Sequence, residues 1–173
     1  MWARTILFLL LACLGPGLAT AQTCTLDFTI RVTQGVGDIR PDDELQGHAE
    51  YTALGQSFRQ EGGTTAWLAS GTMTLGSGIS GPIWTLMTTS RGPTADLMGI
   101  YAHHVEGLTV AGIPFEGPMA LTLFGPSGSR PDPSPPTTQE DWDRLDLRRA
   151  FSLQAHGHDM LSGEVTELTA MCE

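Results

Sequence analysis

The sequence contains no lysine and no asparagine, and its nine basic residues are outnumbered by 19 acidic ones. The formal net charge is −10 at pH 7. Nucleic acids and anionic membrane surfaces attract basic patches, so a chain this acidic is a poor partner for either. Without asparagine there is no N-glycosylation site. We interpret the exclusive use of arginine as the bias of a GC-rich bacterial genome.

Long apolar runs are also missing. The longest, residues 6–14, is too short to cross a bilayer, which needs about 20 residues. It follows Arg4 and precedes a Gly-Pro-Gly break and an Ala-Thr-Ala sequence that ends at residue 21. This is the arrangement of a secretory signal peptide. We therefore expect residues 1–21 to be a signal peptide, residues 22–173 to form one domain without a transmembrane segment, and the protein to be periplasmic or secreted.

A lipid anchor at Cys13 is the alternative. Residues 10–13, Leu-Leu-Ala-Cys, are similar to the lipobox at which bacterial lipoprotein signals are cut, and Cys13 would then carry the lipid. The apolar run before Cys13 is short for such a signal, and a good cleavage site follows it. We therefore favour cleavage before Gln22. The lipid would anchor the protein without changing its fold.

Cysteine is scarce, with three residues in the chain. Cys13 is lost with the signal peptide or consumed by lipid, so Cys24 and Cys172 remain at the two ends of the mature chain. In an oxidising compartment we expect these two to form a disulfide. The alternative is two separate buried thiols.

The mature chain alternates between apolar and polar residues, beginning with residues 24–33, which is typical of half-buried β-strands. Gly- and Pro-rich breaks separate further strand-like runs at residues 48–54, 67–75, 83–91, 97–105 and 119–124, and a short hairpin is expected to turn near Ala111 and Gly112. No amphipathic helix of normal length competes with these runs. The sequence therefore predicts an all-β, single-domain antiparallel β-sandwich or barrel, without deciding whether the sheet closes.

One long Pro-rich insertion, residues 125–149, interrupts this pattern. Its first half predicts an exposed loop, and its second half predicts a short surface helix that begins near Thr137 and packs Trp142 onto the sheet. Glu140 and Arg144 are four residues apart, the spacing of a helical ion pair. Long insertions in compact domains are often functional, although some are merely tolerated. The candidate binding surface comprises Trp142, Arg144 and Arg148.

His156, His158 and Asp159 form the best candidate metal motif. Two histidines that are two residues apart on a strand point the same way, as in many zinc and copper sites. They share a face with Ser152 and Gln154, which places them in solvent, and a closed site needs a further ligand such as His104 or His48. We therefore prefer an exposed hairpin tip without metal or other cofactor, with zinc or copper as the alternative.

No catalytic constellation stands out. No cysteine is free once the pair forms, and no Gly-x-Ser-x-Gly motif is present. Trp67 and Trp84 have the chemistry to stack on sugars, but strand tryptophans more often pack in a core. We expect a non-enzymatic exported domain of the bacterial cell envelope that binds an unidentified ligand or envelope protein through residues 125–149 or a sheet face. A periplasmic copper or zinc protein is the second hypothesis, and an enzyme of unknown class is the third.

Intact-mass measurement of protein purified from its native host tests the cleavage site. We expect a chain that begins at Gln22 and carries no lipid, because the Ala-Thr-Ala motif ends one residue earlier. A diacylated chain that begins at Cys13 would contradict this prediction.

Overall fold

The computed structural model describes residues 21–60, 63–155 and 158–173. All but the last residue of the predicted signal peptide, and the alternative lipid site at Cys13, lie outside these residues. His156 also lies outside them, and the side chains of His158 and Asp159 are not described.

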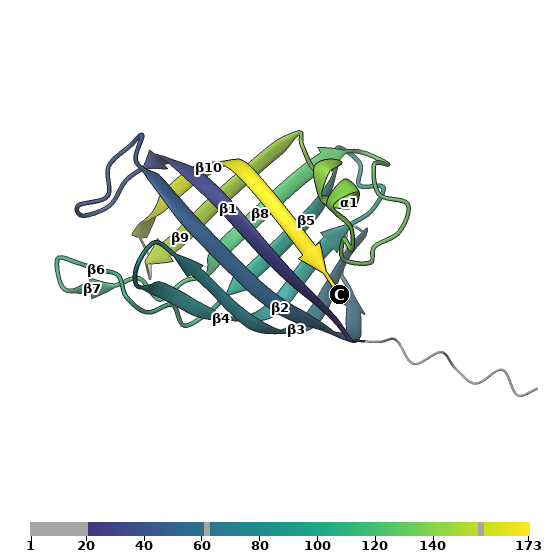
Figure 1. Ribbon diagram of the computed structural model, residues 1–173, viewed down its shortest axis with the longest axis horizontal. Helices are drawn as coiled ribbons and strands as arrows, with labels where there is room; N and C mark the ends of the chain where they lie inside the picture. Colours follow the sequence, from purple (N-terminus) through teal and green to yellow (C-terminus); the bar gives the residue numbers. More distant parts are fainter. Residues whose placement is uncertain (1–20, 61–62, 156–157) are drawn as a thin grey trace, which may run out of the picture.

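The long strands form one closed antiparallel barrel in which each strand pairs with its neighbour in the sequence and the last strand pairs with the first (Figure 1). The strands of the barrel are β1 (Gln22–Gln34), β2 (Glu44–Arg59), β3 (Thr64–Leu75), β4 (Ile79–Thr89), β5 (Ala95–Ala102), β8 (Met119–Pro126), β9 (Arg148–Ala155) and β10 (His158–Cys172). A separate hairpin consists of β6 (Thr109–Val110) and β7 (Ile113–Pro114), and the helix α1 (Gln139–Asp143) lies between β8 and β9. The all-β prediction is confirmed, and of its two alternatives the sheet adopts the barrel. No helix of the described residues is long and apolar enough to cross a membrane.

Several strands extend beyond their predicted bounds. The turn before β4 is shorter than the predicted break at residues 76–82, because Ile79 already pairs with Leu75 and is buried. Strand β2 continues to Arg59 through a register shift between Ala53 and Ser57. Neighbouring strands supply hydrogen-bond partners over these added residues, which the local sequence does not reveal.

Apolar side chains fill the barrel interior. The alternation in β1 points Leu26, Phe28 and Ile30 inward, where each is at most 2% exposed. The rings of Phe28 and Phe151 face each other across the interior at 6.2 Å. Gly47 of β2 makes room for Phe28, because a Cβ at that position would lie 2.1 Å from the ring. An eight-stranded barrel is just wide enough for side chains to fill it, and this one has a packed core.

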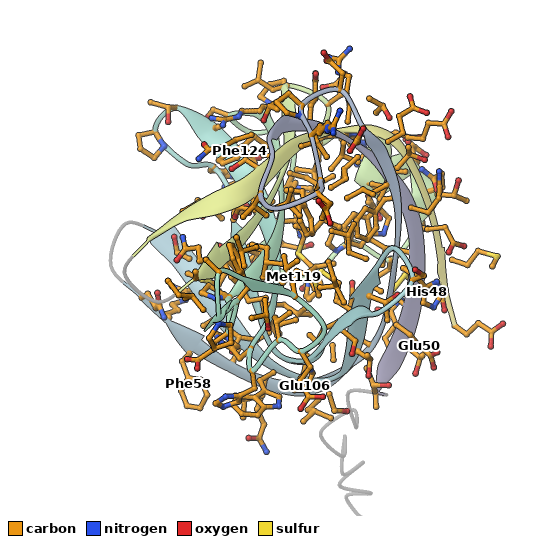
Figure 2. All side chains as sticks on the ribbon, turned by 90° about the vertical axis from the view of Figure 1, so that its left-hand side faces the viewer. His48, Glu50, Phe58, Glu106, Met119 and Phe124 are labelled. Atoms are coloured by element: carbon orange, nitrogen blue, oxygen red, sulfur yellow. A yellow bond between two sulfur atoms is a disulfide. The ribbon has the colours of Figure 1, made fainter. Side chains whose placement is uncertain are left out.

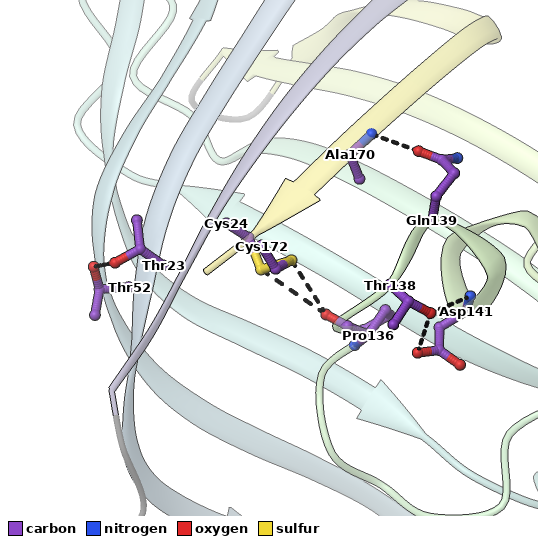
Figure 3. Close-up of a disulfide and its surroundings, with 9 residues drawn as sticks. All are labelled: Thr23, Cys24, Thr52, Pro136, Thr138, Gln139, Asp141, Ala170 and Cys172. Atoms are coloured by element: carbon purple, nitrogen blue, oxygen red, sulfur yellow. Dashed lines mark hydrogen bonds between the residues drawn. A yellow bond between two sulfur atoms is a disulfide. The ribbon is translucent and has the colours of Figure 1, made fainter.

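A disulfide joins the first and last strands, which confirms the predicted pairing of Cys24 and Cys172 (Figure 3). The sulfur atoms are 2.04 Å apart, and the two residues lie directly opposite each other on β1 and β10. Their neighbours Thr23 and Glu173 exchange both backbone hydrogen bonds, so the cysteines occupy a non-hydrogen-bonded pair. Opposed Cα atoms come closest in such pairs, which accounts for a Cα separation of 4.1 Å.

Replacing both cysteines with alanine tests the contribution of this bond to stability. The bond spans 148 residues of chain, and loops of more than about 100 residues correspond to roughly 4 to 5 kcal/mol in the chain-entropy treatment. We expect urea unfolding to show a loss of this size. The reduced parent protein should match the double variant, since neither has the cross-link. A loss below about 1 kcal/mol would show that the closed sheet does not need the bond.

Candidate functional site

One end of the barrel is covered by residues 127–147, which connect β8 to β9 and which we call the covering segment. Figure 1 shows α1 and the loop before it at the end of the barrel where β10 ends. The predicted insertion began at residue 125, but Gly125 and Pro126 belong to β8, and Arg148 and Arg149 belong to β9. The covering segment is therefore slightly shorter than predicted.

Asp96 holds the start of the covering segment. Its carboxylate is fully buried at the covered end and accepts hydrogen bonds from the backbone N–H of Arg130 at 2.7 Å, the backbone N–H of Gly92 at 3.1 Å and the Ser129 hydroxyl at 3.3 Å. Burial works to raise the pKa of Asp96, but these donors and the backbone of Gly128 outweigh it, so the pKa lies below its ordinary value. The carboxylate is therefore ionised at neutral pH.

Further hydrogen bonds fix the covering segment to the barrel wall. The Ser90 hydroxyl donates to the carbonyl of Arg130 at 3.0 Å, and the buried Thr88 hydroxyl donates to the carbonyl of Pro133. The backbone N–H of Ala170 donates to the side-chain oxygen of Gln139 at 2.7 Å (Figure 3). Thr88 and Ser90 lie at the end of β4, Asp96 lies on β5 and Ala170 lies on β10, so the segment is attached at several points of the barrel rim.

The segment also rests on the disulfide. The Pro136 carbonyl oxygen lies 3.9 and 3.8 Å from the sulfur atoms of Cys24 and Cys172 (Figure 3). A disulfide sulfur has no proton to donate, so these approaches are van der Waals contacts. The cross-link therefore supports the covering segment as well as the seam between β1 and β10.

Thr138 caps helix α1, one residue after the predicted start at Thr137, and its hydroxyl accepts from the backbone N–H of Asp141. The predicted ion pair between Arg144 and Glu140 is present at 2.6 Å. Trp142 is fully buried, so its indole packs inward as expected but offers no surface to a partner. Arg148 is exposed, with its guanidinium 6.0 Å from the centre of the Phe124 ring.

A small pocket of about 130 Å³ lies within the covering segment, and we call it the Arg130 pocket. Its lining includes Arg130, Asp132, Ser134, Asp141 and Arg144. Arg130 is 6% exposed, and its Nη2 donates to the carbonyl of Ser134. Its Nη1 is buried and has no hydrogen-bond partner among the described residues. Arg130 thus lines the pocket and also carries a buried donor that lacks an acceptor.

The charge of Arg130 is also unpaired at close range. Burial lowers the pKa of Arg130, whereas the charges of Asp132, Asp96 and Asp141 raise it. None of these carboxylates forms an ion pair with the guanidinium, and neither does any other carboxylate of the described residues. A buried guanidinium is costly unless an anion or an acceptor contacts it directly.

Tyr51 presents a second donor near Arg130. The side chain is 1% exposed, and its hydroxyl is buried without a partner. Burial raises the pKa of Tyr51, and the positive charge of Arg130 opposes part of that increase. The phenol is therefore protonated at neutral pH and close enough to Arg130 for the charge to act on it.

The histidines are dispersed. His48 lies on the outside of β2, with its Nδ1 2.7 Å from Asp27 Oδ1, and His104 packs against Trp84 on the outer wall. Over residues 21–60, 63–155 and 158–173, no three His, Cys, Asp or Glu side chains come together as a metal site. Within β9, the alternation that was used to place His156 holds as far as Ala155, which is buried.

The sequence alone did not identify Asp96, Tyr51 or Arg130. The signal for Asp96 was its position in an alternating strand, because Met98 and Ile100, two and four residues later, are buried. An acid at an inward position predicts a bound partner for that acid. Arg130 lies in a Pro-rich stretch without periodicity, so no local pattern marks it as buried.

Comparison of the chain with models of protein families, with curated proteins and with solved structures gives no match. The evidence on function is therefore the geometry of the described residues.

The variant Asp96→Asn tests the main anchor of the covering segment. We expect its free energy of unfolding to fall by about 1 to 3 kcal/mol at pH 7, because an amide NH₂ would face buried N–H donors. The folded pKa lies below the value of about 3.9 in an unfolded chain, so the contribution of Asp96 is complete above that pH and disappears as the pH falls through the folded value. Urea unfolding from pH 7 downward measures the difference between the two proteins.

The matched control is Asp43→Asn, because Asp43 is exposed, lies away from the covering segment and accepts one hydrogen bond, from the backbone N–H of Arg40. Its effect should stay within about 0.5 kcal/mol. If Asp96→Asn were as stable as the parent at pH 7, or if the difference did not shrink in acid, the anchoring role of Asp96 would be wrong.

Proposed function

We propose that the protein is an exported, non-enzymatic β-barrel of the bacterial cell envelope that binds a small carboxylate ligand at Arg130. One observation carries this proposal: Arg130 is nine-tenths buried, lines a pocket, and has an Nη1 donor without a partner and no ion pair among the described residues. Carboxylates bind guanidinium groups through short, charge-assisted hydrogen bonds. A carboxylate would supply both the missing acceptor and the missing counter-charge.

The surrounding charges favour a monoanion. Asp132 and Asp141 line the same pocket, and both act on Arg130 through their negative charge. A doubly charged phosphate or sulfate would meet more repulsion from them than a single carboxylate would. The buried Tyr51 hydroxyl, whose pKa responds to the charge of Arg130, does not itself line this pocket.

Binding suits these groups better than catalysis does. The guanidinium of Arg130 stays protonated at neutral pH, and burial raises the pKa of Tyr51. Both groups therefore donate hydrogen bonds, and neither accepts a proton from a substrate at neutral pH. This supports a carrier or sensor of a small acid rather than an enzyme.

Two features support export to the periplasm or beyond. The N-terminal sequence has the layout of a signal peptide. The bond between Cys24 and Cys172 joins the first strand to the last, and disulfides persist in oxidising compartments.

Thermal unfolding of the mature protein with sodium acetate as the probe tests the proposal, with acetamide as the uncharged analogue and ionic strength held constant. We expect acetate to stabilise the parent in a saturable way, by about 1.4 kcal/mol at ten times its Kd, and acetamide to have no effect. The variant Arg130→Met should lose the acetate response. Its own stability should stay within about 1 kcal/mol of the parent, because a methionine removes the cost of a buried charge.

Arg144→Gln is the matched control, because Arg144 lines the same pocket but is already paired with Glu140 and Asp141. This variant should keep the acetate response. An equal response of the parent to acetate and acetamide, or an acetate response retained by Arg130→Met, would show that the proposal is wrong.

A further inference from the structure

We propose a second binding site, for a neutral β-linked oligosaccharide, on the outer wall of the barrel at Trp84. It is separate from the Arg130 pocket, because Trp84 lies in the middle of β4 and points away from the core. The evidence for it is an aromatic platform, a polar groove beside that platform, and the charges along the groove.

The side chain of Trp84 lies at the surface and not in the core. Its side chain is 48% exposed, although a tryptophan gains much from burial. The register between β4 and β5 shifts between Ile83 and Thr85, so Trp84 is the extra residue of a bulge. Bulges redirect side chains and are common beside functional sites.

Two imidazoles hold the indole in place. The His103 ring stacks on Trp84 with centroids 5.8 Å apart, and the His104 ring meets it edge-on at 4.9 Å. The backbone of His104 is left-handed, with a φ of 53°, which is uncommon outside glycine. Ser80 and Glu106 exchange backbone hydrogen bonds at 3.1 and 2.8 Å, which ties this turn to β4. The platform is therefore fixed before any ligand arrives.

Polar side chains surround the platform. A hollow of about 440 Å³ is lined by Trp84 together with Thr72, Ser80, His104 and Glu106. A neighbouring hollow of about 200 Å³ is lined by Glu50, Thr52, Ser70 and Thr72. The two hollows share Thr72, so they adjoin each other across β2, β3 and β4, and we call the pair the groove. In Figure 2, Glu50 and Glu106 both lie on the outer surface of the barrel.

This chemistry fits a saccharide. The flat C–H face of a pyranose packs on an indole, while its hydroxyls pair with threonine, serine and carboxylate groups at the edges. Among the described residues, two carboxylates and no arginine line the groove, which disfavours an anionic ligand. In β-linked glucose units the glycosidic bond is equatorial, as the ring hydroxyls are, so both faces of the ring are flat. The groove extends beyond Trp84, which favours an oligomer over a single sugar.

Calorimetry with the full mature chain tests this site, with cellotetraose and N,N′,N″-triacetylchitotriose as probes. We expect at least one to bind, and we expect Trp84→Ala to weaken its binding at least tenfold, whereas Trp84→Phe should restore part of the affinity. Leu68→Ala is the matched control, because Leu68 is 37% exposed on β3 and lines neither hollow. That variant should bind within twofold of the parent.

Sorbitol supplies the chemical control, since it carries hydroxyls without a flat ring face. Equal binding of sorbitol, unchanged binding by Trp84→Ala, or no binding of either oligosaccharide by the parent would overturn the proposal. Arg130→Met should bind the oligosaccharide as the parent does, so the experiment tests this site independently of the proposed carboxylate site.

Discussion

The pairing of the last strand with the first is the constraint on which the rest of the structure depends. Strands β1 and β10 run antiparallel from the Cys24–Cys172 pair to the Gln34–Ser162 pair, and this seam closes the sheet. Closure removes the exposed strand edges that an open sheet would present to other chains. It also directs one face of every strand toward a common interior, so a single core forms. The disulfide locks the seam at the end where the covering segment rests on it.

A closed barrel of eight strands leaves little free volume, and here the core residues use it. Leu26, Met73, Ile100 and Leu121 are each 0% exposed. Related architectures place one small ligand in the lumen, but this interior is occupied by its own side chains. The polar groups with unused binding capacity therefore lie where the interior ends or on the outer wall. The covering segment extends the chain over one end and brings Arg130 to a position that no strand provides.

Local sequence patterns predicted what depends on local physics. Alternation predicted the strand β1, and the spacing of Glu140 and Arg144 predicted the ion pair of the helix. Closure depends instead on register shifts, such as that between Leu68 and Gly71, which no short window of sequence encodes. The two proposed sites, at Arg130 and at Trp84, also depend on long-range pairing that local patterns do not encode. Arg130 is held by contacts with residues distant in the sequence. Trp84 is exposed at a bulge, although strand tryptophans more often pack inward.

The carboxylates around Arg130 explain how the folded protein accommodates a buried guanidinium without a bound anion. The three carboxylates that act on it already accept hydrogen bonds elsewhere: Asp96 from backbone N–H groups, Asp132 from the N–H of Ser134, and Asp141 from Thr138 and Arg144. They supply a negative field that offsets part of the desolvation cost, but they do not supply a contact to Nη1. The proposed carboxylate would therefore add only the last hydrogen bond and a fraction of the charge compensation. Its binding would accordingly be weak and readily reversed.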